Sequence, residues 1–266
     1  MAKGISLHIG LNFVDPDHYA GWDGKLMACE NDARDMEKIA SSVGYTTKTL
    51  IRQQATLDRV IREISYAASQ LKKGDIFYLS YSGHGGSVPD RNNDERDGMD
   101  ETWALYDGHL IDDKLRELWS RFSAGVRVLV TSDSCHSGTV IRAVEQNEES
   151  GARKQVPFDV TVETYRKNSA FYDEMIESLP KVKDSEIKAS IKLISGCQDN
   201  QYSYDGFFNG QFTGKLREVW DNGRYRGNYY QFHKEITRRM PSNQTPNHYH
   251  AGFRSRDFEM QSPFRI

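Results

Sequence analysis

Cys135 and His84 are the two residues of this chain whose types and surroundings indicate nucleophilic chemistry. A thiol attacks carbon only as the thiolate, and its free pKa of about 8.5 means that it needs a base or a cation beside it. Taken alone, Cys135 is explained as a small buried hydrophobe and His84 as part of a glycine turn. Together they predict a thiol and imidazole pair, because each follows an apolar run in the same way.

Two predicted strands position this pair. The mostly apolar run 126–132 is followed by DSCHSG, and the run 75–81 is followed by SGHGG. If these strands lie side by side and parallel, both tips emerge at one edge of the sheet, which is where open α/β sheets bind ligands. The glycines on either side of His84 let backbone N–H groups approach a substrate closely.

The rest of the chain alternates between strand and helix patterns, which predicts a mostly parallel sheet with helices on both faces. The polar segment 141–160 shows no periodicity and predicts a flexible or cleavable linker. The other expected strands are 4–12, 46–51, 103–106, 187–195 and a weak one near 248–253, and the main expected helices are 27–43, 57–71, 171–176, 210–220 and 229–240.

Composition predicts a cytoplasmic globular protein. The 266 residues are 27% charged and 37% hydrophobic, and the net charge of −3 comes without a basic block, which argues against nucleic acid as a partner. Cys29, Cys135 and Cys197 are too few for a disulfide framework and lack the spacing of a zinc site, so a reducing compartment fits. The N-terminus is a poor signal peptide and too short to span a membrane, so no membrane partner is expected.

The two tips, YSGHGG and DSCHSG, resemble the His and Cys motifs of caspase-like cysteine peptidases, and of metacaspases and their prokaryotic relatives in particular. ACEND, HLIDD, ISGCQDNQYSYD and NQTPN follow in the family's order, and the likeness fails mainly over 142–186. The resemblance implies an α/β fold, the caspase-like three-layer α/β/α sandwich with a mostly parallel central sheet. It implies one peptidase domain over 1–266, with a large-subunit-like part at about 1–141, a linker at about 142–186 and a small-subunit-like part at about 187–266.

The same resemblance assigns catalytic roles to the tips. It implies that Cys135 is the nucleophile and His84 the general acid and base. The backbone N–H groups of Gly85 and Cys135 would form the oxyanion hole. No third carboxylate is fixed in this clan, so the prediction is a dyad. His136, next to the nucleophile, is assigned a structural role.

An acidic pocket is predicted beside the dyad. Asp133 lies two residues before Cys135 and therefore on the same side of an extended strand. The resemblance pairs Asp133 with Asp32 as the floor of a pocket for the side chain of Arg or Lys, with Ser82 and Cys29 as neighbours. Each carboxylate also has an ordinary explanation, as a strand-end hydrogen-bond acceptor for Asp133 and as a residue favoured near a helix N-terminus for Asp32. The prediction is an endopeptidase that cleaves protein or peptide substrates after Arg or Lys and not after Asp.

Calcium is the one cofactor that the resemblance suggests, and no organic cofactor is expected. Asp100, Asp112 and Asp113 match family positions that bind an activating Ca²⁺, although Asp112 is equally explained as a helix N-cap. Where the family has a fourth carboxylate this chain has Arg142, a cation that would compete with the metal. Arg142 could instead be a self-cleavage site or a latch in the acidic pocket, so calcium dependence stays open.

The same family resemblance leads to expectations for self-processing and for the oligomeric state. The linker region offers basic cleavage points that make self-processing a hypothesis, and metacaspases are generally monomeric, so a monomer is expected. One alternative is a non-catalytic relative that uses the fold as a Ca²⁺-responsive or partner-binding module. A cysteine phosphatase is excluded by spacing, because its Arg would fall at Ile141. The basic cleavage points are Arg142, Arg153, Lys154, Arg166, Lys167 and Lys181.

Overall fold

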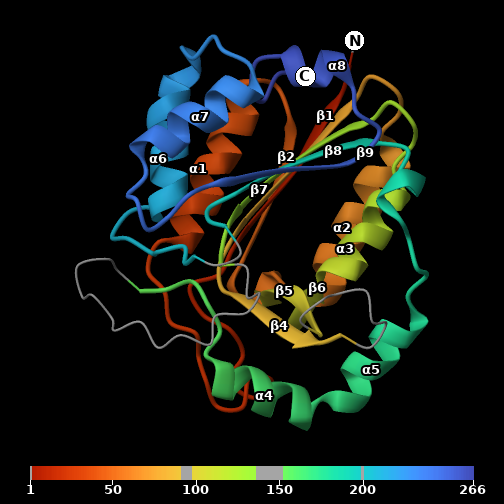
Figure 1. Ribbon diagram of the computed structural model, residues 1–266, viewed down its shortest axis with the longest axis vertical. Helices are drawn as coiled ribbons and strands as arrows, with labels where there is room; N and C mark the ends of the chain where they lie inside the picture. Colours follow the sequence, from red (N-terminus) through yellow and green to blue (C-terminus); the bar gives the residue numbers. More distant parts are fainter. Residues whose placement is uncertain (1, 91–97, 136–151, 199–200) are drawn as a thin grey trace.

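A six-stranded sheet forms the centre of the protein (Figure 1). The computed structural model describes residues 2–90, 98–135, 152–198 and 201–266. The strand order is β2-β1-β3-β7-β8-β9, in which every neighbouring pair is parallel except the last. The strands are β1 (Gly4–Gly10), β2 (Thr46–Ile51), β3 (Ile76–Ser82), β7 (Arg127–Asp133), β8 (Ser190–Ser195) and β9 (Asn247–Gly252).

Helices cover both faces of this sheet and bury two separate cores (Figure 1). The central strands are mostly apolar because both of their faces are covered, and all of β3 is buried. This arrangement confirms the predicted α/β class with a mostly parallel sheet between helical layers. One layer contains α1 (Cys29–Ser42), α6 (Gln211–Trp220) and α7 (Tyr229–Arg239), and the other contains α2 (Leu57–Gln70) and α3 (Asp112–Ser120).

A second, three-stranded antiparallel sheet begins where β3 ends. The sequence indicated only one short strand here, because glycines and charged residues obscure the alternation that marks a strand. Its first strand starts at Gly85, directly after His84, so this sheet fixes the backbone beside the predicted imidazole. The strands are β4 (Gly85–Pro89), β5 (Met99–Leu105) and β6 (Gly108–Ile111).

The predicted linker contains more regular structure than its sequence indicated. Two helices lie within it, and Tyr172 of the second packs against Val88 and Ile111 of the small sheet. Tertiary packing therefore stabilises helices whose own periodicity is weak. They are α4 (Phe158–Lys167) and α5 (Ser169–Ser178), and the remaining elements are η1 (Arg52–Gln54), η3 (Asp184–Glu186), η4 (Asp221–Gly223) and α8 (Arg256–Met260).

The register of β3 and β7 brings the two predicted tips together. Ser82 pairs with Asp133 at the last position of the ladder, so His84 and Cys135 each lie two residues beyond it. The two strands are adjacent and parallel, as the sequence predicted. Across the ranges that the structure covers, no helix combines the length and apolarity that crossing a membrane requires.

Candidate active site

His84 is buried just beyond the tip of β3, and one of its two ring nitrogens, Nδ1, is available to accept a proton. Its Nε2 lies 2.9 Å from the carbonyl oxygen of Gly24, and its ring meets Trp22 edge to face at 4.7 Å. Because a carbonyl only accepts, Nε2 carries the hydrogen of the neutral ring and Nδ1 keeps a lone pair. Nδ1 has no hydrogen-bond partner within the described residues. Burial lowers the pKa of His84 to about 4, against the opposing effect of the Gly24 carbonyl, so the ring is neutral at pH 7 and able to accept a proton.

Cys135 lies at the tip of β7 with its sulfur directed at the backbone of Ser203. The Ser203 N–H donates to Sγ at 3.1 Å, and Sγ lies 3.5 Å from the Ser203 carbonyl oxygen. Burial raises the pKa of the Cys135 thiol, the neighbouring Cys197 thiol adds to this, and the Ser203 N–H opposes it. In the covered part of the chain, no hydrogen bond joins Sγ to His84. The two groups share one sheet edge, with the thiol turned toward Ser203.

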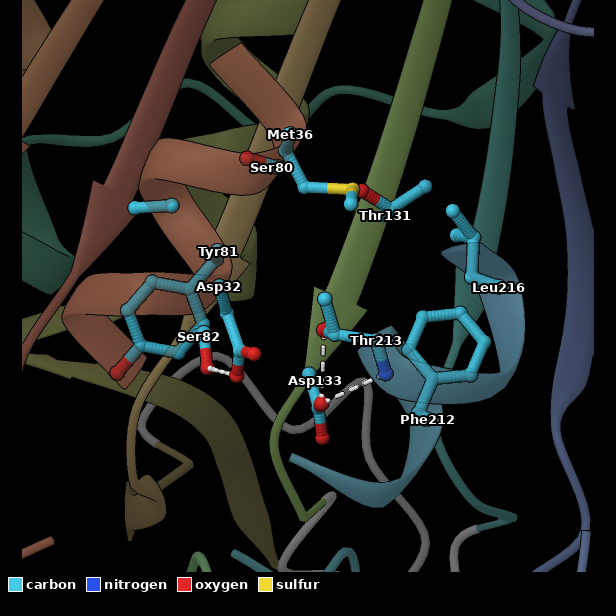
Figure 2. Close-up of a pocket in the computed structure, with 11 residues that line it drawn as sticks. Asp32, Met36, Ser80, Tyr81, Ser82, Thr131, Asp133, Phe212, Thr213 and Leu216 are labelled. Carbon is cyan, nitrogen blue, oxygen red and sulfur yellow. Dashed lines mark hydrogen bonds between the residues drawn. The ribbon is translucent and has the colours of Figure 1, made fainter. Parts of the chain in front are cut away.

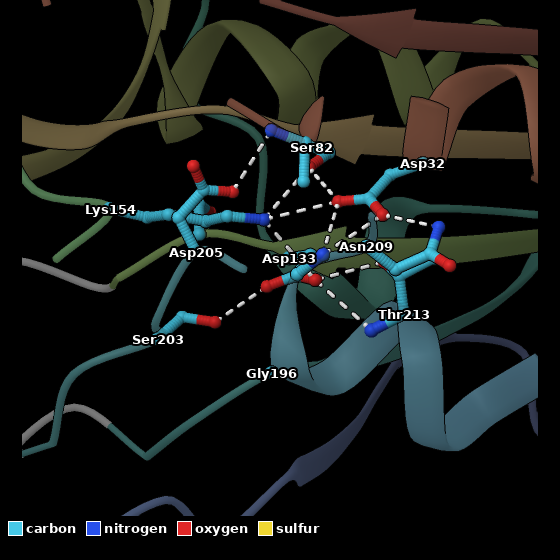
Figure 3. Close-up of polar contacts among 12 residues, drawn as sticks. Asp32, Ser82, Asp133, Lys154, Gly196, Ser203, Asp205, Asn209 and Thr213 are labelled. Atoms are coloured by element: carbon cyan, nitrogen blue, oxygen red, sulfur yellow. Dashed lines mark hydrogen bonds and ion pairs between the residues drawn. The ribbon is translucent and has the colours of Figure 1, made fainter. Parts of the chain in front are cut away.

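Asp32 forms one side of an enclosed acidic pocket (Figure 3). It lies in the first turn of α1 and is 1% exposed. The Ser82 hydroxyl donates to its Oδ2 at 2.7 Å, and the Gly210 N–H lies 3.0 and 3.1 Å from its two oxygens. Asn209 Nδ2 donates to Oδ1 at 2.9 Å. Two segments far apart in sequence, the end of β3 and residues 209–210, therefore hold this carboxylate in place.

Asp133 forms the other side of the pocket. It is the last residue of β7 and is also 1% exposed. The Ser203 hydroxyl donates to Oδ1 at 2.6 Å. Thr213, in the first turn of α6, donates to Oδ2 from its N–H at 3.0 Å and from its hydroxyl at 2.9 Å. These donors fix the orientation of the carboxylate at the N-terminus of α6.

Lys154 fills the pocket between the two carboxylates (Figure 3). Its Nζ lies 3.2 Å from Asp32 Oδ2, 3.3 Å from Asp133 Oδ2 and 2.9 Å from the Ser82 hydroxyl, and its side chain is 0% exposed. Burial by itself lowers the pKa of Lys154, but the nearby anions, Asp133 first, raise it well above its ordinary value. Burial raises the pKa of Asp32 to about 6, against the opposing effect of the Lys154 ammonium. The pocket therefore holds a buried cation that forms ion pairs with both carboxylates.

The carbonyl of the same lysine lies at the predicted oxyanion hole. The Gly85 N–H donates to the Lys154 oxygen at 3.0 Å and the Cys135 N–H donates to it at 3.1 Å. A side chain at position 85 would overlap the Cys135 carbonyl, so only glycine lets the two backbones approach this closely. The structure brings the side chain of Lys154 to the acidic pair and its carbonyl to these two donors.

Gly210 is a pocket residue that the sequence did not single out. It directly precedes α6, and a Cβ built on it would overlap both Lys154 Nζ and Asp133 Oδ2. Ser203, which bonds both Asp133 and the Cys135 sulfur, was also missed, as were the donors Asn209 and Thr213. The sequence signals for these residues were weak. Gly210 is a glycine at the start of a predicted helix, and Ser203 is a serine inside ISGCQDNQYSYD.

A cavity of about 10 Å³ lies against the acidic pair, which is room for about one water molecule (Figure 2). Figure 2 shows Asp32 with Ser82 on one side and Asp133 with Thr213 on the other. With Lys154 in place the pocket has little space left. The cavity is lined by Asp32, Ala33, Met36, Ser80, Tyr81, Ser82, Thr131, Asp133, Phe212, Thr213 and Leu216.

Comparison with known proteins assigns the family. The Caspase domain family matches residues 12–257. This chain belongs to the caspase-domain family. Metacaspase-1A of Aspergillus clavatus is 28% identical to it over 252 residues and Metacaspase-1 of Coccidioides immitis is 29% identical over 252 residues. Each match covers 80% of this chain but 57% and 53% of the relative, so the chain spans about half the length of the curated relatives it matches.

Solved structures of other proteins share this caspase-domain fold. Protein GSU0716 from Geobacter sulfurreducens is 56% identical, with a TM-score of 0.93 and 99% of both chains covered. Caspase-1 from Spodoptera frugiperda is 12% identical, with a TM-score of 0.56 over 95% of this chain and 88% of that chain, a likeness of fold alone. These matches confirm the family and the fold that the motifs suggested.

The remaining predicted pocket residue, Cys29, lies at the start of α1 and is buried within this caspase domain. Burial raises the pKa of its thiol, against the opposing effect of the Lys154 ammonium. Cys29 is therefore a buried neutral thiol, and its role as a pocket residue stays a prediction.

Two of the three predicted calcium residues lie beside an arginine. Arg116 lies 3.5 Å from a carboxylate oxygen of Asp112 and 4.0 Å from one of Asp113, so a protein cation already accompanies both. Over the covered residues of the caspase domain, no group of three or more His, Cys, Asp or Glu is arranged to hold a metal ion. Calcium binding at Asp100, Asp112 and Asp113 therefore stays a prediction. His136 and Arg142 fall outside the described residues.

Proposed function

We propose that this protein is a cysteine endopeptidase that hydrolyses peptide bonds after Lys or Arg, with Cys135 as nucleophile and His84 as general acid and base. Membership of the caspase-domain family and the metacaspase relatives support a cysteine peptidase. The observation that carries the finer proposal is the lysine ammonium enclosed between Asp32 and Asp133. A pocket that takes Lys154 at 0% exposure is complementary to a basic side chain of a substrate.

The geometry supports a role for each backbone donor. The N–H groups of Gly85 and Cys135 converge on one carbonyl oxygen, at 3.0 and 3.1 Å. In the proposed reaction the negative charge that develops on this oxygen strengthens both bonds, and one such donor typically contributes about 3 kcal/mol to the transition state. The pocket lies beside these donors because Asp133 is only two residues from the nucleophile.

The state of His84 supports its role as a base. Its Nδ1 keeps a lone pair and has no hydrogen-bond partner within the described residues, so this nitrogen is the one that can take the thiol proton. The Cys135 sulfur has to turn from Ser203 toward the substrate carbonyl before it can attack. Catalytic hydrogen bonds commonly tighten in this way when substrate binds.

The pocket also accounts for the expected rejection of acidic substrates. An Asp side chain would bring a third carboxylate into a space enclosed by Asp32 and Asp133. Like charges within a few ångströms in a buried site repel strongly or force protonation. Partners of the proposed enzyme are therefore proteins or peptides with a basic residue before the cut bond. The monomeric state, the cytoplasmic location and the absence of a nucleic-acid partner stay predictions.

Hydrolysis of fluorogenic peptides that carry Lys, Arg or Asp before the reporter tests the proposal. We expect wild-type protein to cut the Lys and Arg peptides and Cys135→Ala to cut none. Asp133→Asn should lower kcat/KM on the Lys peptide by roughly 100-fold, because the pocket loses half of its negative charge. The matched control is Asp58→Asn, which removes the same charge from an exposed carboxylate on α2 and should behave as wild type.

Two outcomes would contradict this function. Faster hydrolysis of the Asp peptide than of the Lys peptide would contradict the assignment of Asp32 and Asp133 to a pocket for basic side chains. A protein that cuts no peptide, and whose Cys135 is not alkylated by a lysine chloromethyl ketone, would support the non-catalytic binding module instead.

A further inference from the structure

Cys197 is a second buried thiol beside Cys135, and the proposed reaction does not use it. It lies two residues beyond the end of β8, the strand next to β7, just as Cys135 lies two residues beyond the end of β7. The two strands are parallel, and Ser132 pairs with Ser195 at the end of their ladder. The Gly196 N–H extends this pairing by donating to the Ser132 carbonyl at 2.7 Å. The chain therefore carries one cysteine at each of two adjacent strand tips.

The register of these strands indicates how far apart the two cysteines are. Continued by two residues past the ladder, it puts Cys197 opposite Ser134, one residue short of Cys135. The side chain agrees with this position, because Cys197 Sγ lies 3.5 Å from the Ser134 carbonyl oxygen. Adjacent strands lie about 4.8 Å apart and rise about 3.3 Å per residue, so the diagonal between the two Cα atoms is roughly 6 Å. Disulfides join Cα atoms that are about 4.4–6.8 Å apart.

The sulfur of Cys135 is turned toward the Cys197 side of β7. β8 lies on one side of β7 and β3 lies on the other, so Cys197 and His84 approach Cys135 from opposite directions. The Cys135 sulfur accepts the N–H of Ser203, a residue of the chain that continues from Cys197, at 3.1 Å. Burial raises the pKa of Cys135, and the Cys197 thiol raises it further as a hydrogen-bond partner. The two thiols therefore lie within reach of each other.

These observations describe a pair of thiols at a separation that a disulfide can span. We propose that Cys135 and Cys197 form a modification site, at which a hydroperoxide converts the two thiols into a disulfide. The disulfide requires only the two sulfurs, whereas its effect on activity rests on the proposed function. A Cys135 sulfur bonded to Cys197 has no thiolate to offer a peptide carbonyl, so the oxidised protein should be inactive. In the reducing compartment that the cysteine content predicts, such a disulfide is transient.

The oxidation balances with one molecule of hydrogen peroxide. The Cys135 thiolate attacks one peroxide oxygen, the O–O bond breaks, and the other oxygen leaves as hydroxide and takes up the thiol proton as water. The product is a sulfenic acid at Cys135. The Cys197 sulfur then attacks the sulfenic sulfur, the S–O bond breaks, and the hydroxyl leaves with the Cys197 proton as a second water. The two thiols together lose two electrons and two protons, and the peroxide is reduced.

Cys29, the third thiol of the chain, provides an internal comparison. It is as buried as Cys197, with 0% of its surface exposed. However, it is the first residue of α1, a helix that packs against β1, β2 and β3 and not at the tips of β7 and β8. Burial is therefore common to both thiols, and it is the position at the neighbouring strand tip that makes Cys197 the partner of Cys135. Cys29 should stay a free thiol when this disulfide forms.

Intact-mass spectrometry of the purified full chain after treatment with hydrogen peroxide tests the inference. The treatment is run at about pH 9, because burial raises the pKa of Cys135 and only the thiolate reacts. We expect wild-type protein to lose the mass of two hydrogen atoms, and peptide mapping to find Cys135 joined to Cys197. Cys197→Ala should instead gain oxygen atoms at Cys135, since no neighbouring thiol captures the sulfenic acid. The matched control is Cys29→Ala, which removes another buried thiol and should form the disulfide as wild type does.

Hydrolysis of a Lys peptide before and after oxidation measures the effect on activity. Before oxidation, Cys197→Ala should cut the peptide, which shows that the variant is folded, and Cys197→Ser is a second variant for the same purpose. Oxidised wild-type protein should lose its activity and regain it in dithiothreitol. Oxidised Cys197→Ala should stay inactive in dithiothreitol, because thiols do not reduce the sulfinic acid that forms at an unprotected Cys135.

The mass measurement does not depend on peptidase activity, so the two proposals fail separately. The inference would be overturned by wild-type protein in which Cys135 gains oxygen while Cys197 stays a free thiol. Wild-type protein that joins Cys135 to Cys29, or that does not react, would overturn it as well. A protein that forms the predicted disulfide but cuts no peptide before oxidation would support the inference and overturn the proposed function.

Discussion

Gly210→Ala offers a sharp test of the acidic pocket because it adds one methyl group and changes no charge. A Cβ at this position would overlap both Lys154 Nζ and Asp133 Oδ2, and it would lie 3.0 Å from Asp133 Cγ. Real Cβ atoms essentially never approach other heavy atoms this closely, so the cation or the carboxylate must move. The backbone N–H that Gly210 donates to Asp32 is retained in the variant.

The size of the effect follows from the contacts that the ammonium loses. The Lys154 ammonium makes three polar contacts, at 3.2, 3.3 and 2.9 Å. It cannot move away from the added methyl group without losing at least one of them. Loss of one hydrogen bond to a charged group costs about 1.5–3 kcal/mol. Since 1.4 kcal/mol is a factor of ten, kcat/KM on Lys and Arg peptides should fall by about 10- to 100-fold. Overpacking should also lower the free energy of unfolding by about 1–3 kcal/mol.

Gly214→Ala is the matched control, because it makes the same substitution one turn along α6. A Cβ there meets only the Cβ of Asn209, at an ordinary 3.7 Å. This control should keep wild-type kcat/KM and gain slightly in stability, since alanine favours a helix over glycine. Iodoacetamide labelling of Cys135 should be the same in both variants. Wild-type kcat/KM for Gly210→Ala on the Lys peptide would show that basic side chains bind elsewhere and would refute the pocket.

Two further predictions concern pH and calcium. Burial raises the pKa of Asp32 to about 6, so its carboxyl is charged above that pH and neutral below it, and kcat/KM on the Lys peptide should fall as the pH drops through about 6. Asp32→Asn should lack this step in the pH profile, and an identical step in both proteins would assign the titration to another group. If Asp100, Asp112 and Asp113 hold an activating ion, millimolar calcium should raise kcat/KM and Asp112→Asn should abolish the rise. Equal rates in calcium and in chelator would remove calcium from the proposal.

The sequence predicted the parts of the site that depend on local pattern. The apolar runs before His84 and Cys135 are strands because residues buried on both faces must be apolar, and such runs are visible in one sequence. Their parallel pairing then fixes which side chains share an edge. Asp32 and Asp133 were brought together only by the family resemblance, since no local rule connects a helix start to a distant strand end.

The sequence did not reveal how the linker returns to the site. Lys154 was one of several basic residues, and nothing in ARKQV distinguishes it from its neighbours. Its position depends on bonds to Ser203 and Gly85, which lie 49 and 69 residues away along the chain. Helix α4 was missed for the same reason, and α5 was expected only over 171–176, because packing against the small sheet stabilises both helices more than their own periodicity does.

Burial of the acidic pair beneath Lys154 has a consequence for how partners approach. While the lysine is in place, its ammonium offsets much of the field that Asp32 and Asp133 would project, and a diffusing polypeptide meets little attraction at this edge. Departure of the lysine would open a narrow mouth lined by one sign of charge, a shape that focuses field lines into solvent. Capture of basic chains by the opened form would then be fast in dilute buffer and slow in concentrated salt.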